Sequence, residues 1–261
     1  MTALYNLIGT QYNSSRAADP GIVSRLSKFL AISNSQRYID IACGSGNYTA
    51  ALANVGGQWT GIDISEVMLT RAKARAAGME WRLGDASELP FESDVFSGAV
   101  CTLAAHHFQS LDQPFQEARR ALKSGALVLF TGLADQMRNY WLYHYFPEMM
   151  RQSIDAMPTE ERLRESLYHA GFKEVKTFPF FITSSLQDLF LFSGKVRPEI
   201  YFDKSVRNNM SSFSRLCEQN ELTTGLAALE RDINSGTFEA VQLRHESTRG
   251  DYAFIVASTG I

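Results

Sequence analysis

The segment DIACGSG at residues 40–46 decides the fold of this chain, because it joins the end of an apolar strand to a glycine turn. An apolar run that starts at Arg37 leads into it, a helical pattern follows, and a second apolar run ends at Asp63. This order is typical of a βαβ unit that binds a nucleotide at the carboxyl ends of its parallel strands. Glycines let the backbone approach such a ligand closely, and one carboxylate can accept hydrogen bonds from both ribose hydroxyls. The segment therefore predicts a site for an adenosyl-ribose ligand.

The spacing of the glycines argues against a dinucleotide. A dinucleotide-binding turn needs a third glycine three residues after the second, and Thr49 occupies that position. The chain also shows no obvious catalytic Tyr-x-x-x-Lys motif. A nicotinamide-dependent oxidoreductase would share the first βαβ unit, but this chain lacks both features. Titration with each cofactor separates the two classes.

Four stretches resemble motifs of the class I S-adenosylmethionine-dependent methyltransferases. Residues 40–46 resemble the first motif, whose usual form is an acid, two small or apolar residues and then C-G-x-G. Later stretches resemble the third motif, the fourth strand with its loop, and the helix, turn and fifth strand: GDASELPF at 84–91, VFSGAVCTLAAHHF at 95–108 and FQEARRALKSGALVLF at 115–130. The last departs from the usual R-x-L-K-P-G-G, since Ser124 and Ala126 replace the proline and the second glycine. Residues 193–213 and the C-terminal end resemble a ubiquinone- and menaquinone-biosynthesis-like subgroup.

The alternation of strand and helix patterns over residues 37–132 predicts an α/β fold with parallel βαβ units. The resemblance implies a Rossmann-like, doubly wound, seven-stranded mixed sheet, whose last strand (251–258) is antiparallel. We expect one domain overall. Its expected parts are an N-terminal helical lid at 1–36, a cofactor-binding core at 37–182 and 250–261, and helical lid insertions at 133–160 and 183–237.

The resemblance also implies a set of residues for S-adenosylmethionine. Asp63 would bind the ribose, Asp85 with Ala86 would lie at the adenine edge, and Asp40 would fix the glycine loop and, through water, the methionine ammonium. Capping or turn formation is the alternative role for Asp40 and Asp85. The complete expected cofactor set is Tyr12, Arg16, Asp40, Ala42, Gly44, Gly46, Asp63, Ile64, Met68, Asp85, Ala86 and Leu103.

The N-terminal run 11–16 resembles the lid motif Y-D-x-x-R of the same superfamily. Tyr12 would close over the cofactor, and Arg16 would meet its carboxylate. Asn13 replaces the usual acid, and an unrelated surface helix is the alternative.

Two further groups are candidates for the acceptor side of the site. His106 and His107 follow the fourth strand, where a neutral imidazole can take a proton from a hydroxyl or an ammonium group. A structural pair of rings is the alternative. The aromatic residues after the fifth strand either form a substrate-binding wall or belong to the core: Tyr140, Trp141, Tyr143 and Tyr145.

The composition is that of an ordinary globular chain with no strong charge. It has 261 residues, 25 basic and 28 acidic side chains and a formal net charge of −3. Neither this charge nor any cluster of Lys and Arg indicates binding of nucleic acid. A nucleic-acid base methyltransferase would also show an Asn/Asp-Pro-Pro-aromatic run where this chain has residues 104–107. The three cysteines lack metal-site spacing, no metal site is expected, and no signal peptide or apolar stretch of about 20 residues is visible. We expect a cytoplasmic protein without membrane insertion.

The sequence thus predicts a methyltransferase that converts S-adenosylmethionine to S-adenosylhomocysteine while methylating a small, partly apolar metabolite. Secondary-metabolite or antibiotic biosynthesis would suit such an acceptor. Whether oxygen, nitrogen or carbon is methylated stays open, as does the oligomeric state, because fold does not fix function. A non-catalytic partner or regulatory subunit that binds the cofactor or its product is the alternative from another class.

Overall fold

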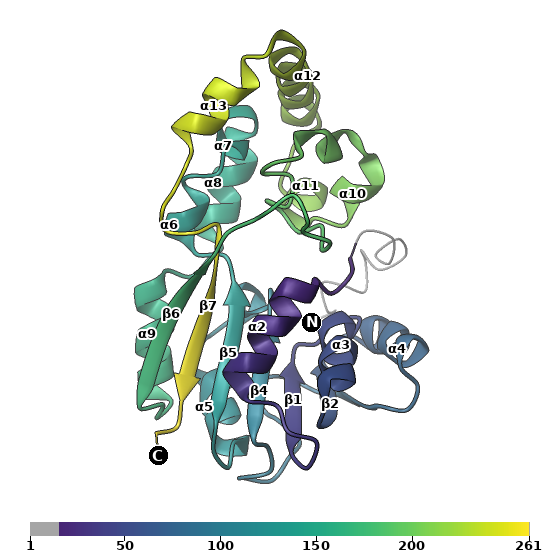
Figure 1. Ribbon diagram of the computed structural model, residues 1–261, viewed down its shortest axis with the longest axis vertical. Helices are drawn as coiled ribbons and strands as arrows, with labels where there is room; N and C mark the ends of the chain where they lie inside the picture. The colour runs from purple at the N-terminus through teal and green to yellow at the C-terminus, as the bar shows by residue number, and fades with distance from the viewer. Residues whose placement is uncertain (1–15, 261) are drawn as a thin grey trace.

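A seven-stranded sheet forms the centre of the molecule in a computed structural model, which describes residues 16–260 (Figure 1). The strand order is β3-β2-β1-β4-β5-β7-β6. The strands are β1 (Arg37–Ile41), β2 (Gln58–Asp63), β3 (Glu80–Leu83), β4 (Gly98–Thr102), β5 (Ala126–Thr131), β6 (Glu174–Phe180) and β7 (Tyr252–Ser258). Strands β1 to β5 pair in parallel, whereas β7 runs antiparallel to both β5 and β6. The predicted mixed sheet with an antiparallel last strand is confirmed.

Side chains alternate between the two faces of the sheet, and each face buries its own apolar cluster. Tyr38, Val100 and Phe130 belong to one cluster, together with the apolar side chains of α2 (Pro20–Leu30) and α3 (Asn47–Val55). Residues one position along the strands, such as Ile39, Ala99 and Leu129, belong to the other. That second cluster includes the apolar residues of α5 (Asp112–Ala121) and α9 (Glu160–His169).

Helix α2 begins where the sequence places a helix start. Asp19 accepts hydrogen bonds from the backbone N–H groups of Gly21 and Ile22 at 2.9 and 3.0 Å, and Pro20 occupies the first helical position. Ile22, Leu26 and Leu30 are spaced by four residues, so they form one buried stripe against the sheet. The helix therefore lies across the front of the sheet in Figure 1.

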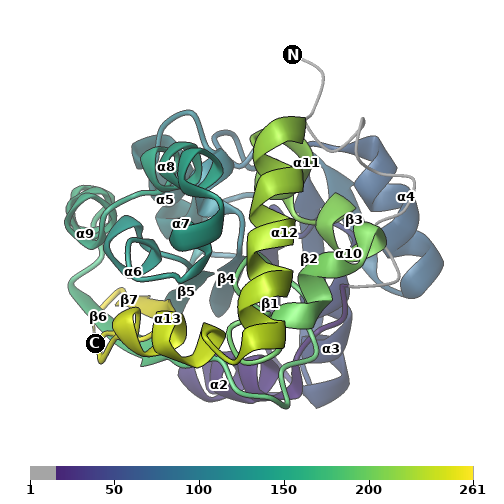
Figure 2. The same ribbon diagram turned by 90° about the horizontal axis from the view of Figure 1, so that it is seen from above.

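Two insertions form a helical cap beyond the carboxyl ends of the parallel strands (Figures 1 and 2). The first follows β5, and the second separates β6 from β7. Their helices are α6 (Ala134–Met137), α7 (Leu142–Tyr145), α8 (Pro147–Asp155), α10 (Lys204–Asn208), α11 (Ser211–Arg215), α12 (Gln219–Ser235) and α13 (Phe238–Arg244). Helix α12 packs on α7, and α11 packs on α8, so the two insertions share one apolar core.

A partly buried ion pair joins the cap to the sheet. The Lys195 ammonium donates to both oxygens of Asp251 at 2.7 and 3.0 Å, and Asp251 also accepts from the Ile182 backbone N–H at 2.8 Å. Asp251 lies directly before β7, so this pair holds the second insertion against the end of the sheet. Among residues 16–260, no helix has the length and apolarity needed to cross a bilayer.

Candidate functional site

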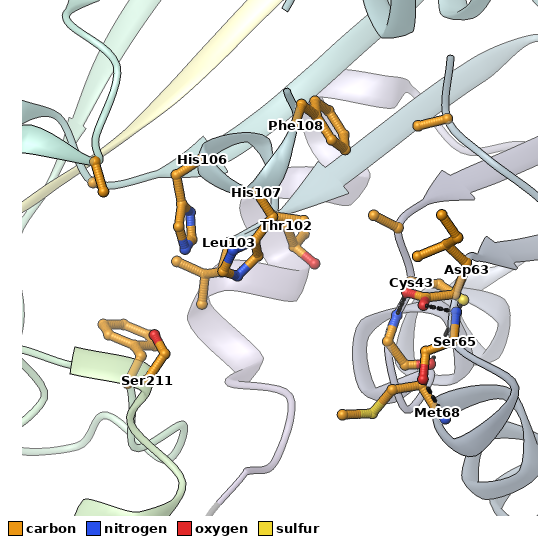
Figure 3. A pocket seen from close by; sticks show the side chains of 18 of the residues that line it. Cys43, Asp63, Ser65, Met68, Thr102, Leu103, His106, His107, Phe108 and Ser211 are labelled. Carbon is orange, nitrogen blue, oxygen red and sulfur yellow. Dashed lines mark hydrogen bonds between the residues drawn. The ribbon is translucent and has the colours of Figure 1, made fainter. Parts of the chain in front are cut away.

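A cavity of about 770 Å³ lies where the carboxyl ends of β1, β2 and β4 face the cap. Residues at the ends of these strands line one half of it, including Gly44, Asp63 and Met68. The other half lies between the loop after β4 and the cap, with His106 and Ser211 on its wall. Figure 3 shows the two halves, with Asp63, Ser65 and Met68 on one side and Leu103, His106 and Ser211 on the other.

The turn after β1 brings backbone to the surface of the cavity. Ala42 and Gly44 both line the cavity and have positive φ angles of 57° and 55°. A Cβ built on Gly44 would meet no atom of residues 16–260 within 4 Å, apart from its chain neighbours, so this position leaves room for a ligand against the backbone. Cys43 also lines the cavity, but burial raises the pKa of its thiol well above the usual range, which keeps it protonated.

Gly46 has a different role from the one expected. It does not line the cavity, and a Cβ at this position would lie 2.4 Å from Trp81 Cη2. Its φ angle of 72° places it at the left-handed start of α3. The glycine is needed because α3 must begin there and pack closely on Trp81, so its expected contact with the cofactor is not supported by its position.

Asp63 ends β2 and is held in one orientation by the backbone. Its Oδ2 accepts from the Gly44 N–H, and its Oδ1 accepts from the Ser65 N–H, each at 2.8 Å. The side chain is only 8% exposed yet lines the cavity. Burial raises the pKa of Asp63, and the two N–H donors oppose that rise. Each oxygen keeps lone pairs for further donors, so the carboxylate can accept from a pair of ligand hydroxyls.

Asp40 lies behind the turn, outside the cavity lining. The Thr49 hydroxyl donates to its Oδ2 at 2.6 Å, while Oδ1 has no hydrogen-bond partner among residues 16–260. Burial raises the pKa of Asp40 to about 7; the Thr49 bond opposes the rise, and the Asp63 charge adds to it. Its position suits support of the turn rather than direct contact with a ligand.

Most of the remaining expected cofactor residues do line the cavity. Asp85 lies on the loop after β3, where its Oδ1 accepts from the Ser87 N–H at 2.8 Å. The others on the lining are Ile64, Met68, Ala86 and Leu103. A carboxylate with spare acceptor capacity, an open glycine and apolar walls fit an adenosyl group with its ribose. Leu103, like Ala42, has a positive φ (53°), a strained conformation that the sequence does not reveal.

Arg16 lines the cavity, but a cap residue binds its guanidinium. Its Nε donates to Asp188 Oδ1 at 2.5 Å and its Nη2 to Oδ2 at 3.2 Å. The Tyr48 hydroxyl donates to the same carboxylate at 3.0 Å. Asp188 therefore ties Arg16 and α3 to the cap, and the expected contact of Arg16 with a cofactor carboxylate stays a prediction. Tyr12, the other expected lid residue, lies outside the described part of the chain.

His106 and His107 lie together on the 3₁₀ turn η2 (Ala105–His107), directly after β4, and both line the cavity. Their ring centroids are 3.9 Å apart, and His106 Nδ1 has no hydrogen-bond partner among residues 16–260. Burial, and secondarily the charge of the neighbouring ring, lowers the pKa of His106 well below its usual value. Burial and then the charge of Arg215 lower the pKa of His107 to about 4. Both rings are therefore neutral near pH 7 and able to accept a proton.

The expected aromatic wall is instead the core of the cap. Tyr140 stacks on Phe192 with centroids 3.8 Å apart, Trp141 is buried, and none of the four expected residues lines the cavity. The Tyr145 hydroxyl donates to Asp232 Oδ2 at 3.0 Å, and Tyr143 is 38% exposed. Tyr140, Trp141 and Tyr145 belong to the apolar cluster that both insertions share, whereas Tyr143 faces solvent.

Other cap residues form the acceptor half, and no motif in the sequence marks them. Apolar members come from both insertions, and polar members come from α8 and α11. They include Met157, Phe190, Met210, Leu216, Ser153, Ser212 and Arg215. The Ser153 hydroxyl donates to Ser212 Oγ at 2.8 Å, which links α8 to α11 across the cavity wall.

Known proteins share both the central motif and the whole arrangement. The methyltransferase domain family matches residues 39–130. A demethylmenaquinone methyltransferase of Staphylococcus aureus is 30% identical over 182 residues, 60% of this chain and 76% of that protein. Another, from Desulfitobacterium hafniense, is 36% identical over 119 residues; the match spans 40% of this chain and 47%, about half, of that relative.

A solved structure shares the cap as well as the sheet. It comes from Anabaena variabilis, is described as a methyltransferase from an antibiotic biosynthesis pathway, and is 30% identical to this chain. The two superpose with a TM-score of 0.81 over 94% of this chain and 99% of that one. The chain therefore belongs to the class I S-adenosylmethionine-dependent methyltransferases.

Proposed function

We propose that this methyltransferase methylates a small, partly apolar metabolite that binds in the acceptor half of the cavity, and that S-adenosylhomocysteine is the second product. The observation that carries the proposal is the single cavity with two unlike halves. One half has the carboxylate and open glycine that suit an adenosyl group, and cap residues line the other. A cavity of about 770 Å³ has room for a small molecule beside the adenosyl group but not for a folded macromolecule.

The chain's own residues position the two reactants. Asp63 would hold the ribose, Gly44 would let the backbone lie against the amino-acid end, and Ile64 and Met68 would flank the adenine. When bound, S-adenosylmethionine supplies a methyl group that is already activated on a sulfonium. The remaining task of the protein is to align the acceptor atom and to exclude water.

We also propose that one of the two histidines takes the acceptor proton. His106 and His107 lie on the wall between the two halves, and both are neutral near pH 7. A hydroxyl acceptor gives its proton to the imidazole as the methyl group arrives, so charge does not build up on the product. An ammonium acceptor gives its proton before the methyl group arrives, because its nitrogen has no lone pair for the transfer until then.

The pH profile and variants test this role. We expect His106→Phe or His107→Phe, whichever removes the base, to lower kcat/KM by about 100-fold or more, with the affinity for S-adenosylmethionine unchanged. If His107 is the base, protonation below its pKa of about 4 inactivates it. The profile of kcat/KM, which reports the free enzyme, should then stay level from about pH 8 down to about pH 5 and fall only below that. An acid limb of kcat/KM near the usual histidine pKa, or full activity in both variants, contradicts the role.

An acceptor screen tests the proposed function as a whole. Release of S-adenosylhomocysteine is measured over a panel of small phenols, amines and carboxylic acids, with an oligonucleotide and a denatured protein as macromolecular controls. We expect turnover within the small-molecule panel alone. Turnover only on a macromolecule contradicts the proposal. Cofactor binding with no turnover on any acceptor would favour a non-catalytic subunit.

We propose a place in secondary metabolism for this reaction. The support is the relative from Anabaena variabilis, which is described as part of an antibiotic biosynthesis pathway and shares the cap through which the acceptor would be chosen. The mixed lining of the acceptor half, with methionines and a phenylalanine beside serines, suits a partly apolar compound of that kind.

A further inference from the structure

We infer that the acceptor carries a carboxylate and that Arg215 of the cap binds it. This inference rests on the proposed function, because it concerns the acceptor half of the same cavity. Arg215 ends α11 and lines the cavity on the side away from the adenosyl half.

The charges around the cavity single out Arg215. Among residues 16–260, the lining carries two carboxylates, Asp63 and Asp85, and both belong to the adenosyl half. The same residues supply one other lining cation, Arg16, whose guanidinium is paired with Asp188 at 2.5 Å. Arg215 has no ion-pair or hydrogen-bond partner among residues 16–260, so the acceptor half presents an uncompensated positive charge.

The surroundings of Arg215 are neutral but polar. His107 is close enough for the Arg215 charge to lower its pKa, and His106 Nδ1 is buried without a partner among the described residues. Ser211 and Ser212 lie on the same short helix and on the same cavity wall. Arg215 itself is accessible to solvent, so an incoming ligand can reach it. A guanidinium with free donors beside neutral groups is suited to a carboxylate, which it can bind through two parallel hydrogen bonds.

Binding of a carboxylate at Arg215 also strengthens the neighbouring base. The Arg215 charge is the second cause, after burial, of the low pKa of His107. A carboxylate opposite Arg215 cancels much of that charge, so the pKa of His107 rises toward its usual value and the ring becomes a better proton acceptor. The correct substrate thus improves the site that methylates it.

Matched acid and amide ligands test the inference. The protein is saturated with S-adenosylhomocysteine and titrated by calorimetry with two pairs: 4-hydroxycinnamate against 4-hydroxycinnamamide, and octanoate against octanamide. We expect at least one acid to bind about 10-fold or more tighter than its amide. Arg215→Gln should remove this preference, because it should weaken binding of the acid and leave binding of the amide unchanged. Arg215→Lys should keep part of the preference.

The control removes the same charge elsewhere on the cap. Arg244 is exposed on α13, outside the cavity lining, so Arg244→Gln should leave the acid preference unchanged. The affinity for S-adenosylhomocysteine, measured first, should be the same in all variants. By nuclear magnetic resonance, Arg215→Gln should also raise the pKa of His107, whereas Arg244→Gln should not.

The failures of the two proposals are distinguishable. Equal binding of acids and amides, no binding of either acid, or equal weakening of both by Arg215→Gln overturns the carboxylate site. Turnover of a neutral small molecule with full activity in Arg215→Gln would also overturn the carboxylate site, while leaving the proposed function intact. No turnover of any small molecule, charged or neutral, removes the proposed function itself.

Discussion

Replacing Asp63 with asparagine is expected to weaken binding of S-adenosylmethionine by a factor of about 100 or more. Two charge-assisted hydrogen bonds to the ribose contribute about 1.5–3 kcal/mol each, and each 1.4 kcal/mol corresponds to a factor of about ten. Asparagine has one acceptor oxygen, while Asp63 uses both of its oxygens to hold the Gly44 and Ser65 N–H groups. The variant therefore also loosens the turn against which the cofactor lies.

Asp63→Ala should abolish binding and also lower stability. It leaves the Gly44 and Ser65 N–H groups without their acceptor, which costs about 1–3 kcal/mol for each one that water does not reach. Asp135→Ala is the matched control, because that aspartate is exposed on α6 and its ion pair with Arg138 is a surface one. Calorimetric titration gives the affinities and urea unfolding gives the stabilities. An Asp63→Asn protein with wild-type affinity would remove the ribose assignment.

Replacing Asp40 with asparagine is expected to change how stability depends on pH. The pKa of Asp40 is about 7 in the folded protein, against 3.8 for a free side chain. Between these values the folded state binds more protons than the unfolded state, so stability falls as pH rises from about 4 to about 7. At about 1.4 kcal/mol for each pKa unit, the contribution lost is roughly 4 kcal/mol.

The side chain of asparagine does not titrate, so the stability of Asp40→Asn does not fall between about pH 4 and pH 7 as that of the wild type does. The free energy of unfolding of the variant should rise relative to wild type by roughly 4 kcal/mol between about pH 4 and pH 8. Its side-chain oxygen can still accept from Thr49, so the local structure is kept. Urea unfolding at several pH values measures the difference, with Asp135→Asn as the control. A difference that stays constant with pH would contradict the buried, proton-binding state of Asp40.

The sequence is most informative where the structure is local. The glycine turn, the strand before it and Asp63 all lie within one βαβ unit, so the spacing of residues predicts both their order and their meeting point. The parallel strands follow from the same alternation, whereas the antiparallel last strand is implied by the family resemblance alone. A pattern over some 25 residues is enough here, because each part contacts the next one along the chain.

The cap is less predictable because its contacts join distant segments. Tyr140 packs on Phe192 and Arg16 pairs with Asp188, residues that no local pattern connects. An aromatic stripe at helical spacing is the same in sequence whether it faces a ligand or a second insertion. Arg215 is the opposite case, a residue that no sequence pattern marks but that lines the cavity. Its place on the cavity wall depends on how the two insertions pack together.

Residue type alone also does not show why a position requires a particular residue. Gly44 and Gly46 are two residues apart and both have positive φ angles. Gly44 faces open space, whereas Gly46 faces Trp81, from a strand that begins more than thirty residues later in the chain. Only the folded arrangement separates a glycine that makes room for a ligand from one that makes room for a tryptophan.

Calorimetric titration of the purified protein with S-adenosylmethionine and S-adenosylhomocysteine, and with NAD and NADP as controls, tests the central claim most directly. The geometry around Asp63 and Gly44 predicts binding of the first two ligands in the micromolar range and none of the dinucleotides. Binding of NAD or NADP in place of the adenosyl pair, or of none of the four, would contradict it.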